Sequence, residues 1–218
     1  MMPPTLSAVI WGNGMQGSEI KVFWLILPLL MVTPTGVAQD RACTGVAFPV
    51  HTQVNGRDLT LNGLGLRKAT FLRIHVYVAA LYVDRPSHDS ADLIDSDESQ
   101  ELILHFVRNV GVQDIREALV KGFERGGRQQ FEILKPRIEK LSSWMTDMKA
   151  GQRLIFVRSP EGVHVSVKGA DKGVIEGEDF SRAVVSIWLG NSPPNPELKR
   201  GLLGGDCGYP QPASQPPS

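Results

Sequence analysis

Side chains that build metal sites are sparse in this sequence of 218 residues. It has only two cysteines, Cys43 and Cys207, and no C-x-x-C pair. Its five histidines are scattered, and no two of them have the H-x-x-x-H spacing that places two ligands on one face of a helix. We therefore expect no metal site, and no motif requires a cofactor.

The chain also lacks an excess of either charge, because 23 Lys and Arg residues balance 23 Asp and Glu residues. A protein that binds nucleic acid through phosphate contacts usually carries a basic excess or a basic stripe. Neither occurs, so nucleic acid is not an expected partner. Gly63-Leu-Gly65 and Gly126-Gly127 are too short for phosphate-binding loops, and we interpret them as turns.

No apolar run reaches the roughly 20 residues that span a bilayer. The longest, Val22 to Val32, follows Lys21 and precedes the small residues Gly36 and Ala38. This pattern is typical of a secretory signal peptide, with an uncleaved membrane anchor as the alternative. We predict that residues 1–38 are a signal peptide, which could start at Met15. The mature protein is then expected to be periplasmic or secreted, without a stable membrane span.

Export would leave the two cysteines near the two ends of the mature chain. In an oxidising compartment Cys43 and Cys207 could pair and fasten both termini, and two free thiols are the alternative. From residue 205 onward the sequence is rich in proline. We therefore expect a disordered tail at 205–218 after a single domain at 39–204.

Hydrophobic spacing divides this domain into strands and helices. The Asn55-Gly56 pair predicts a turn in an early hairpin, and a long strand is predicted from Phe71 to Val83. Further strands are predicted at 102–107, 153–157 and 163–168, a short helix or loop at 87–96, and helices at 112–125, 131–145 with a kink or new start at Pro136, 179–189 and 197–203. This order indicates an α+β fold with an antiparallel sheet.

The long strand carries an unusual row of polar side chains. Alternate residues share a face, and we interpret one face as core: Leu72, Ile74, Val76, Val78, Ala80 and Tyr82. The opposite face presents Arg73, His75 and Tyr77 before it becomes apolar. A tyrosine suits the wall of a half-buried cleft, and a neighbouring arginine can bind a planar carboxylate. A solvated sheet face is the alternative for all three, most of all for Arg73.

Several distinctive segments follow one another through the domain. They are Leu64-Gly-Leu-Arg67, Phe71-Leu-Arg-Ile-His-Val-Tyr-Val-Ala-Ala-Leu-Tyr-Val83, Leu104-His-Phe-Val-Arg108, Arg116-Glu-Ala-Leu-Val-Lys-Gly-Phe123, Lys149-Ala-Gly151, Lys172-Gly-Val-Ile-Glu-Gly-Glu-Asp-Phe180, Ile187-Trp-Leu-Gly190 and Leu198-Lys-Arg-Gly-Leu-Leu-Gly204. Together they cover roughly residues 45–204 and resemble the bacterial branch of the chalcone-isomerase-like family. The resemblance implies an open-faced β-sandwich, in which a layer of helices covers a long antiparallel sheet above a ligand cleft.

The resemblance also indicates which residues could contact a ligand. In the plant enzymes of the family an arginine on the turn before the long strand polarises the flavonoid, and hydroxyl residues organise water near the ketone. Arg67 matches that arginine and Tyr77 takes the place of a threonine, whereas Ile115 and Gly122 replace a tyrosine and an asparagine. The fatty-acid-binding branch is more similar, since it pairs the arginine with a tyrosine to hold the lipid carboxylate.

The resemblance therefore implies a small apolar ligand, such as a fatty acid or a flavonoid-like molecule, on Arg67, Tyr77 and His75. We expect a binding protein rather than an enzyme. The alternative is an isomerase (intramolecular lyase) acting on a chalcone-like or other small enone, with Arg67 as electrophile and Tyr77 as the hydroxyl. A third hypothesis is an interaction protein with a vestigial cleft. The oligomeric state stays open.

Overall fold

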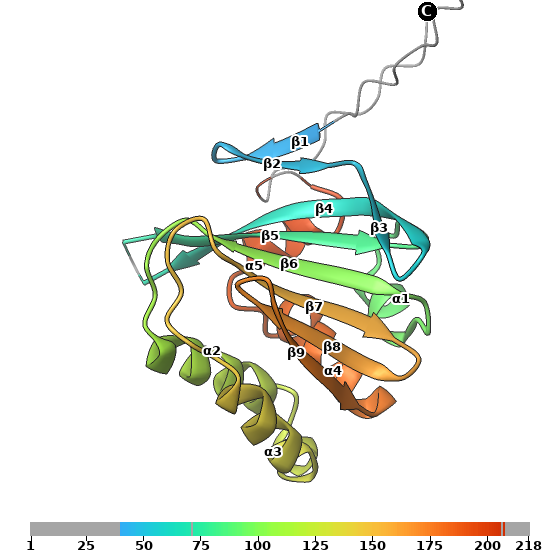
Figure 1. Cartoon of the computed structure of the whole chain (residues 1–218), viewed down its shortest axis with the longest axis vertical. Helices are drawn as coiled ribbons and strands as arrows, with labels where there is room; N and C mark the ends of the chain where they lie inside the picture. Colours follow the sequence, from blue (N-terminus) through green and yellow to red (C-terminus); the bar gives the residue numbers. More distant parts are fainter. Residues whose placement is uncertain (1–39, 71, 206, 208–218) are drawn as a thin grey trace, which may run out of the picture. The chain divides into compact units, whose positions relative to one another are not determined.

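Seven antiparallel strands in sequence order form the main sheet of this protein (Figure 1). The computed structural model describes residues 40–70, 72–205 and 207, so the predicted signal peptide lies outside the described residues. The elements are β1 Asp40–Cys43, β2 Val46–Pro49, β3 His51–Val54, β4 Arg57–Ala69, β5 Ile74–Val83, α1 Ser90–Asp95, β6 Gln100–Phe106, α2 Val112–Glu124, α3 Arg128–Ser143, β7 Arg153–Ser159, β8 Gly162–Val167, β9 Ala170–Glu176, α4 Glu178–Leu189 and α5 Pro196–Leu202. The main sheet runs from β3 to β9, and β1 and β2 form a separate hairpin.

The predicted α+β class and open-faced β-sandwich are confirmed. The helices contribute apolar side chains to one core on one face of the sheet, and α4 and α5 lie behind the strands in Figure 1. The Asn55-Gly56 turn between β3 and β4 is confirmed as well. Both residues have positive φ, 50° and 77°, which is the conformation that favours this pair in tight hairpins.

The predicted strand at Phe71 to Val83 is too long at its start. Thr70 and Arg73 have φ values of 59° and 53°, so the chain turns there and β5 begins at Ile74. Leu72 lies in this turn with 65% of its surface exposed, and its assignment to the core is therefore wrong. The turn lacks a strong glycine or proline signal, which explains why strand periodicity seemed to continue through it.

Both faces of β5 are buried, not one. Ala79, Leu81 and Val83 pack in the core beneath the helices. Of the residues predicted as core, Val78, Ala80 and Tyr82 pack in a second core on the other face, which includes Cys43 and Phe48 of the β1–β2 hairpin. Ile74 and Val76 are only half-buried, and Val76 packs against the core beneath the helices instead.

The interpretation of Gly63-Leu-Gly65 as a turn is wrong, because both glycines lie inside β4. A Cβ atom on Gly63 would stand 2.0 Å from the carbonyl oxygen of Gly201, and one on Gly65 would stand 2.4 Å from that of Leu198. The missing side chains thus let the backbone of α5 lie directly on the strand. Gly126-Gly127 does separate two helices, and Gly127 has a φ of 112°.

Two further details depart from the predictions. Helix α3 continues through Pro136 from Arg128 to Ser143, so no new helix starts at the proline. Strand β9 was not predicted, because only Val174 and Ile175 are apolar side chains with strong strand preference in its sequence.

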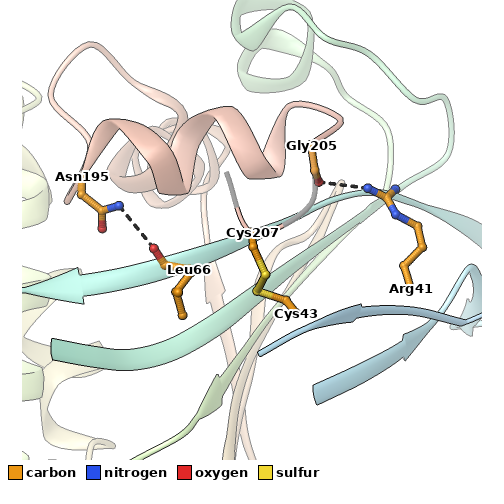
Figure 2. Close-up of a disulfide and its surroundings, with 6 residues drawn as sticks. All are labelled: Arg41, Cys43, Leu66, Asn195, Gly205 and Cys207. Carbon is orange, nitrogen blue, oxygen red and sulfur yellow. Dashed lines mark hydrogen bonds between the residues drawn. A yellow bond between two sulfur atoms is a disulfide. The ribbon is translucent and has the colours of Figure 1, made fainter. Parts of the chain in front are cut away.

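A disulfide joins the hairpin to the end of the described chain (Figure 2). Cys43 and Cys207 pair with their Cα atoms 5.4 Å apart, and Arg41 Nη2 donates to the carbonyl oxygen of Gly205 at 2.9 Å. Of the two states left open by the sequence, the structure therefore has the paired one. Gly205 and Cys207, placed in the predicted tail, are held against the domain, whereas residues 206 and 208–218 lie outside the described part.

Within the described residues, no helix combines the length and apolar character needed to cross a membrane. The same part of the chain contains no group of three or more His, Cys, Asp or Glu side chains that could hold a metal ion.

Candidate ligand-binding cleft

A cleft of ≈ 660 Å³ opens between one end of the sheet and helices α2 and α4. Its volume lies within the usual range for small-molecule sites, about 300–1,000 Å³. Apolar side chains form most of its wall: Ile74, Val76, Leu104, Phe106, Val110, Ile115, Leu119, Leu154 and Ile187. Polar and charged groups lie among them, and Arg67 and Tyr77 are two of these.

The strand register brings Arg67 and Tyr77 together. They are direct partners in the β4–β5 ladder, and directly opposed residues of an antiparallel pair project from the same face. The next pair is Lys68 with His75, so the register skips Val76 and a bulge results. Bulges redirect side chains, and Val76 and Tyr77 both reach the cleft here. His75 is exposed and does not line the cleft.

Arg67 is held at the cleft by the segment before α5. Its Nη1 donates to the carbonyl oxygens of Lys68 and of Pro194, the latter at 3.1 Å, and to Asn195 Oδ1 at 3.4 Å. The half-buried guanidinium has no carboxylate partner among the described residues. Its position in the strand β4, rather than on a turn, corrects the placement that the resemblance implied.

The side-chain amide of Asn195 binds the backbone of β4 with one donor and one acceptor, as a neighbouring strand would. Its Oδ1 accepts from the backbone N–H of Lys68 at 3.2 Å, and its Nδ2 donates to the carbonyl oxygen of Leu66 at 3.3 Å (Figure 2). Asn195 immediately precedes α5, and α5 can approach β4 because Gly63 and Gly65 leave room. Two glycines without a side chain thereby help to position an arginine.

The hydroxyl of Tyr77 is a hydrogen-bond donor that is still available. Trp188, which is only 2% exposed, donates its Nε1–H to Tyr77 Oη at 2.9 Å. An indole N–H can only donate, so the tyrosine hydrogen remains free for another acceptor. Burial raises the pKa of Tyr77 above its usual value, and the contact with Trp188 and the charges of Arg67 and Arg125 offset this only in part. The hydroxyl is therefore neutral near pH 7 and can donate.

The two positions that differ from the plant enzymes have apolar or packing roles. Ile115 is buried and lines the cleft. Gly122 lies on α2 where it faces α4, and a Cβ atom there would stand 2.7 Å from Cγ2 of Ile187. Neither position offers a hydroxyl or amide to the cleft.

Arg73 stands apart from the cleft. Its Nη2 contacts Oε1 of Glu197 at 3.2 Å in an exposed ion pair, and it is not a lining residue. Arg73 is therefore solvated, as the alternative interpretation expected, but it lies in the turn before β5 and not on a sheet face.

Three residues of the site were missed in the sequence. Trp188 lies in an apolar helical stretch, where a tryptophan is most simply explained as core. Asn195 follows two prolines, and only its place before a helix marks it. Arg125 also lines the cleft, from the end of α2. Nothing in the local pattern indicated that Trp188 contacts β5, that Asn195 contacts β4 or that Arg125 lines the cleft.

The family model for chalcone isomerase-like proteins matches residues 40–204, nearly all of the described chain. The chain belongs to the chalcone isomerase-like family. The cleft of this chalcone isomerase-like domain thus lies where the resemblance implied, between sheet and helices. No curated protein matches the sequence.

One solved structure similar to this chalcone isomerase-like domain is a fatty-acid binding protein of Arabidopsis thaliana. The two align with a TM-score of 0.61 and 18% sequence identity, over 76% of this chain and 96% of that one. At this identity the likeness supports the fold.

Proposed function

We propose that this protein binds an apolar carboxylic acid, such as a fatty acid, and that it is a carrier rather than an enzyme. One observation carries the proposal: Arg67 and the free hydroxyl of Tyr77 lie side by side in an apolar cleft, and no carboxylate of the described residues contacts either of them. An arginine and a neutral tyrosine together offer both oxygens of a carboxylate a donor. The fold it shares with a protein described as fatty-acid binding agrees with this proposal.

The apolar wall would supply most of the affinity for such a ligand. Each methylene that leaves water contributes about 0.8 kcal/mol. A charge-assisted hydrogen bond contributes about 1.5–3 kcal/mol, so the arginine would select the acid over its uncharged derivatives.

Isomerase activity is not favoured by the geometry of α2. The wall at Ile115 is apolar and Gly122 faces Ile187, so neither can organise water near a ketone. Incubation with a chalcone should give no turnover above the uncatalysed rate, and rapid cyclisation would refute the assignment as a carrier.

We further propose that the protein is exported. The Cys43–Cys207 disulfide supports this, because such bonds persist in oxidising compartments. N-terminal sequencing of protein from the periplasm or medium should begin near residue 39, and a retained Val22–Val32 segment would argue for an anchor instead.

The decisive test compares a fatty acid with its methyl ester. Arg67→Ala should weaken binding of dodecanoic acid by about 10- to 150-fold, because it removes a charge-assisted hydrogen bond. Binding of methyl dodecanoate should change far less. Isothermal titration calorimetry measures both, and thermal melts check folding.

Arg73→Ala is the matched control, since it removes the same charge from an exposed position outside the cleft. It should leave both affinities unchanged. Equal losses for acid and ester after Arg67→Ala would mean that this arginine supports β4 and not the ligand. Failure of the wild-type protein to bind either molecule would favour a vestigial cleft.

A further inference from the structure

A second arginine faces Arg67 across the same end of the cleft. Arg125 is the C-cap residue of α2 and lines the cleft from the helical side, whereas Arg67 lines it from the sheet. Both guanidinium groups donate to the segment between α4 and α5. Arg67 Nη1 reaches the carbonyl oxygen of Pro194 at 3.1 Å, and Arg125 Nη1 reaches that of Ser192 at 3.5 Å. This shared segment therefore places the two arginines at one end of the cleft.

Tyr77 lies within the field of both arginines. The positive charges of Arg67 and Arg125 each lower the pKa of the Tyr77 hydroxyl, although burial raises it overall. The polar end of the cleft thus has three hydrogen-bond donors from three elements: Arg67 from β4, Tyr77 from β5 and Arg125 from the end of α2.

The two arginines have no negative partner among the described residues. Their recorded contacts are backbone carbonyls and the Asn195 amide. The carboxylates that line the cleft, Asp114 and Glu117, belong to α2, and Glu117 already pairs with Lys121. Glu117 lies eight residues before Arg125, about 12 Å along the helix axis, and Asp114 lies nearly a turn farther away. The C-terminus of α2 supplies only about half a negative charge, so no full negative charge of the described residues balances the half-buried Arg67 or the exposed Arg125.

We propose that Arg125 is a second head-group-binding residue, and that the cleft prefers an apolar molecule whose head carries two negative charges, a phosphate monoester, over one with a single carboxylate. This inference rests on the proposed function, because it takes Arg67 and Tyr77 as the anion-binding end. A phosphate monoester carries about −1.5 to −2 charges at pH 7 and three acceptor oxygens. Three donors at one end of the cleft match three oxygens in number, whereas a carboxylate has two.

Calorimetry with two probes of equal chain length tests the inference. Dodecyl phosphate and dodecanoate are titrated into the full chain at pH 8, where the phosphate is a dianion. We expect the phosphate to bind more tightly. Arg125→Ala should weaken dodecyl phosphate by about tenfold or more, the loss of one charge-assisted hydrogen bond, and dodecanoate by less than about threefold.

Arg128→Ala is the matched control. Arg128 is the exposed first residue of α3, and it is not a lining residue of the cleft. Removing it lowers the charge of the protein by the same amount and should change both affinities little. Thermal melts of both variants check that the fold is intact.

Three results would overturn the inference. Equal losses after Arg128→Ala and Arg125→Ala would mean that the ligand senses only the net charge of the protein. Dodecanoate binding that depends on Arg67, without a preference for the phosphate and without an effect of Arg125→Ala, would overturn the inference and leave the proposed function standing. Binding of neither probe would overturn both.

Discussion

The two faces of the sheet bury the same strand in different ways, and the two tyrosines of β5 show the difference. Tyr77 lies on the helical face, where its hydroxyl accepts from Trp188 and keeps its own hydrogen for another partner. Tyr82 lies on the opposite face and donates that hydrogen to the carbonyl oxygen of Pro49 at 2.8 Å. Burial raises the pKa of both, that of Tyr82 to about 12.

The comparison separates a face that is closed from one that is open. The face that carries Tyr82 is closed. The hairpin β1–β2, the disulfide and the hydroxyl of Tyr82 cover it around a continuous apolar core. On the face that carries Tyr77 the helices leave a cleft. The protein itself does not use all the hydrogen-bond donors of this cleft. Hydrogen-bond donors that open into a cleft, and not the presence of polar residues as such, distinguish the candidate site from the packed side of the sheet.

The largest expected effect is the loss of the disulfide. It joins residues 164 apart in sequence, and its removal in a Cys43→Ala, Cys207→Ala double variant should cost about 3–5 kcal/mol. That corresponds to a fall in Tm of roughly 6–20 °C. Because the bond lies on the closed face, affinity for dodecanoate should stay within about twofold at a temperature where the variant is folded.

Reduction with dithiothreitol provides the control for this variant. It should lower the Tm of the wild-type protein to that of the double variant and leave the variant itself unchanged. A double variant that keeps its Tm but loses affinity for dodecanoate would contradict the prediction, because the disulfide would then support the ligand site and not the stability of the closed face.

A smaller effect separates the two tyrosines directly. Tyr77→Phe removes a neutral hydrogen bond to the ligand, worth about 1 kcal/mol or roughly fivefold in affinity, and it leaves the buried Trp188 N–H without an acceptor. Tyr82→Phe removes one hydrogen bond to the hairpin, and about 1 kcal/mol of stability, without changing ligand affinity. Calorimetry and thermal melts of both variants check the contrast. Equal affinity in the two variants would contradict it.

The smallest effect concerns a buried carboxyl on the closed face. Glu101 is the ladder partner of Tyr82, is only 9% exposed, and has an Oε2 atom with no hydrogen-bond partner. Burial raises the pKa of Glu101, and the charge of Arg153 offsets this in part. A raised pKa in the folded state means that the protonated form favours folding, so this contribution is lost as the pH rises through the folded-state pKa.

Glu101→Gln should therefore raise the Tm near pH 8 and have little effect near pH 3, below the unfolded-state pKa of about 4.3, where the carboxyl is protonated in both states. Thermal melts across this range check the sign. Glu98→Gln is a control, because its carboxylate forms an ion pair with Arg85 in which the arginine is largely exposed. A stabilisation by Glu101→Gln that is equal at both pH values would show that its charge is not the cause.

The sequence allowed the fold and the Arg67–Tyr77 pair to be predicted, but not the groups that hold them. Family motifs and strand patterns are local, and the two residues lie on neighbouring strands. Trp188 reaches Tyr77 across 111 residues and Pro194 reaches Arg67 across 127, so no window of the sequence contains both partners. Gly63 and Gly65 were interpreted as a turn, because glycines are typical of turns. Their role here is to leave room for the backbone of α5, which packs on β4 at a distance that no side chain would allow.

The contacts of Arg67 also have a consequence for the order of folding. Each strand of the main sheet pairs with its neighbours in sequence, so the sheet can grow progressively as the chain becomes available, although β6 pairs with β7 only after α2 and α3. Arg67, in contrast, obtains its carbonyl and amide partners from Pro194 and Asn195, near the end of the domain. A chain that has formed its sheet but has not yet docked α5 would hold the apolar wall without its anchored arginine. Under the proposed function, capture of the acid therefore requires a chain that has docked α5.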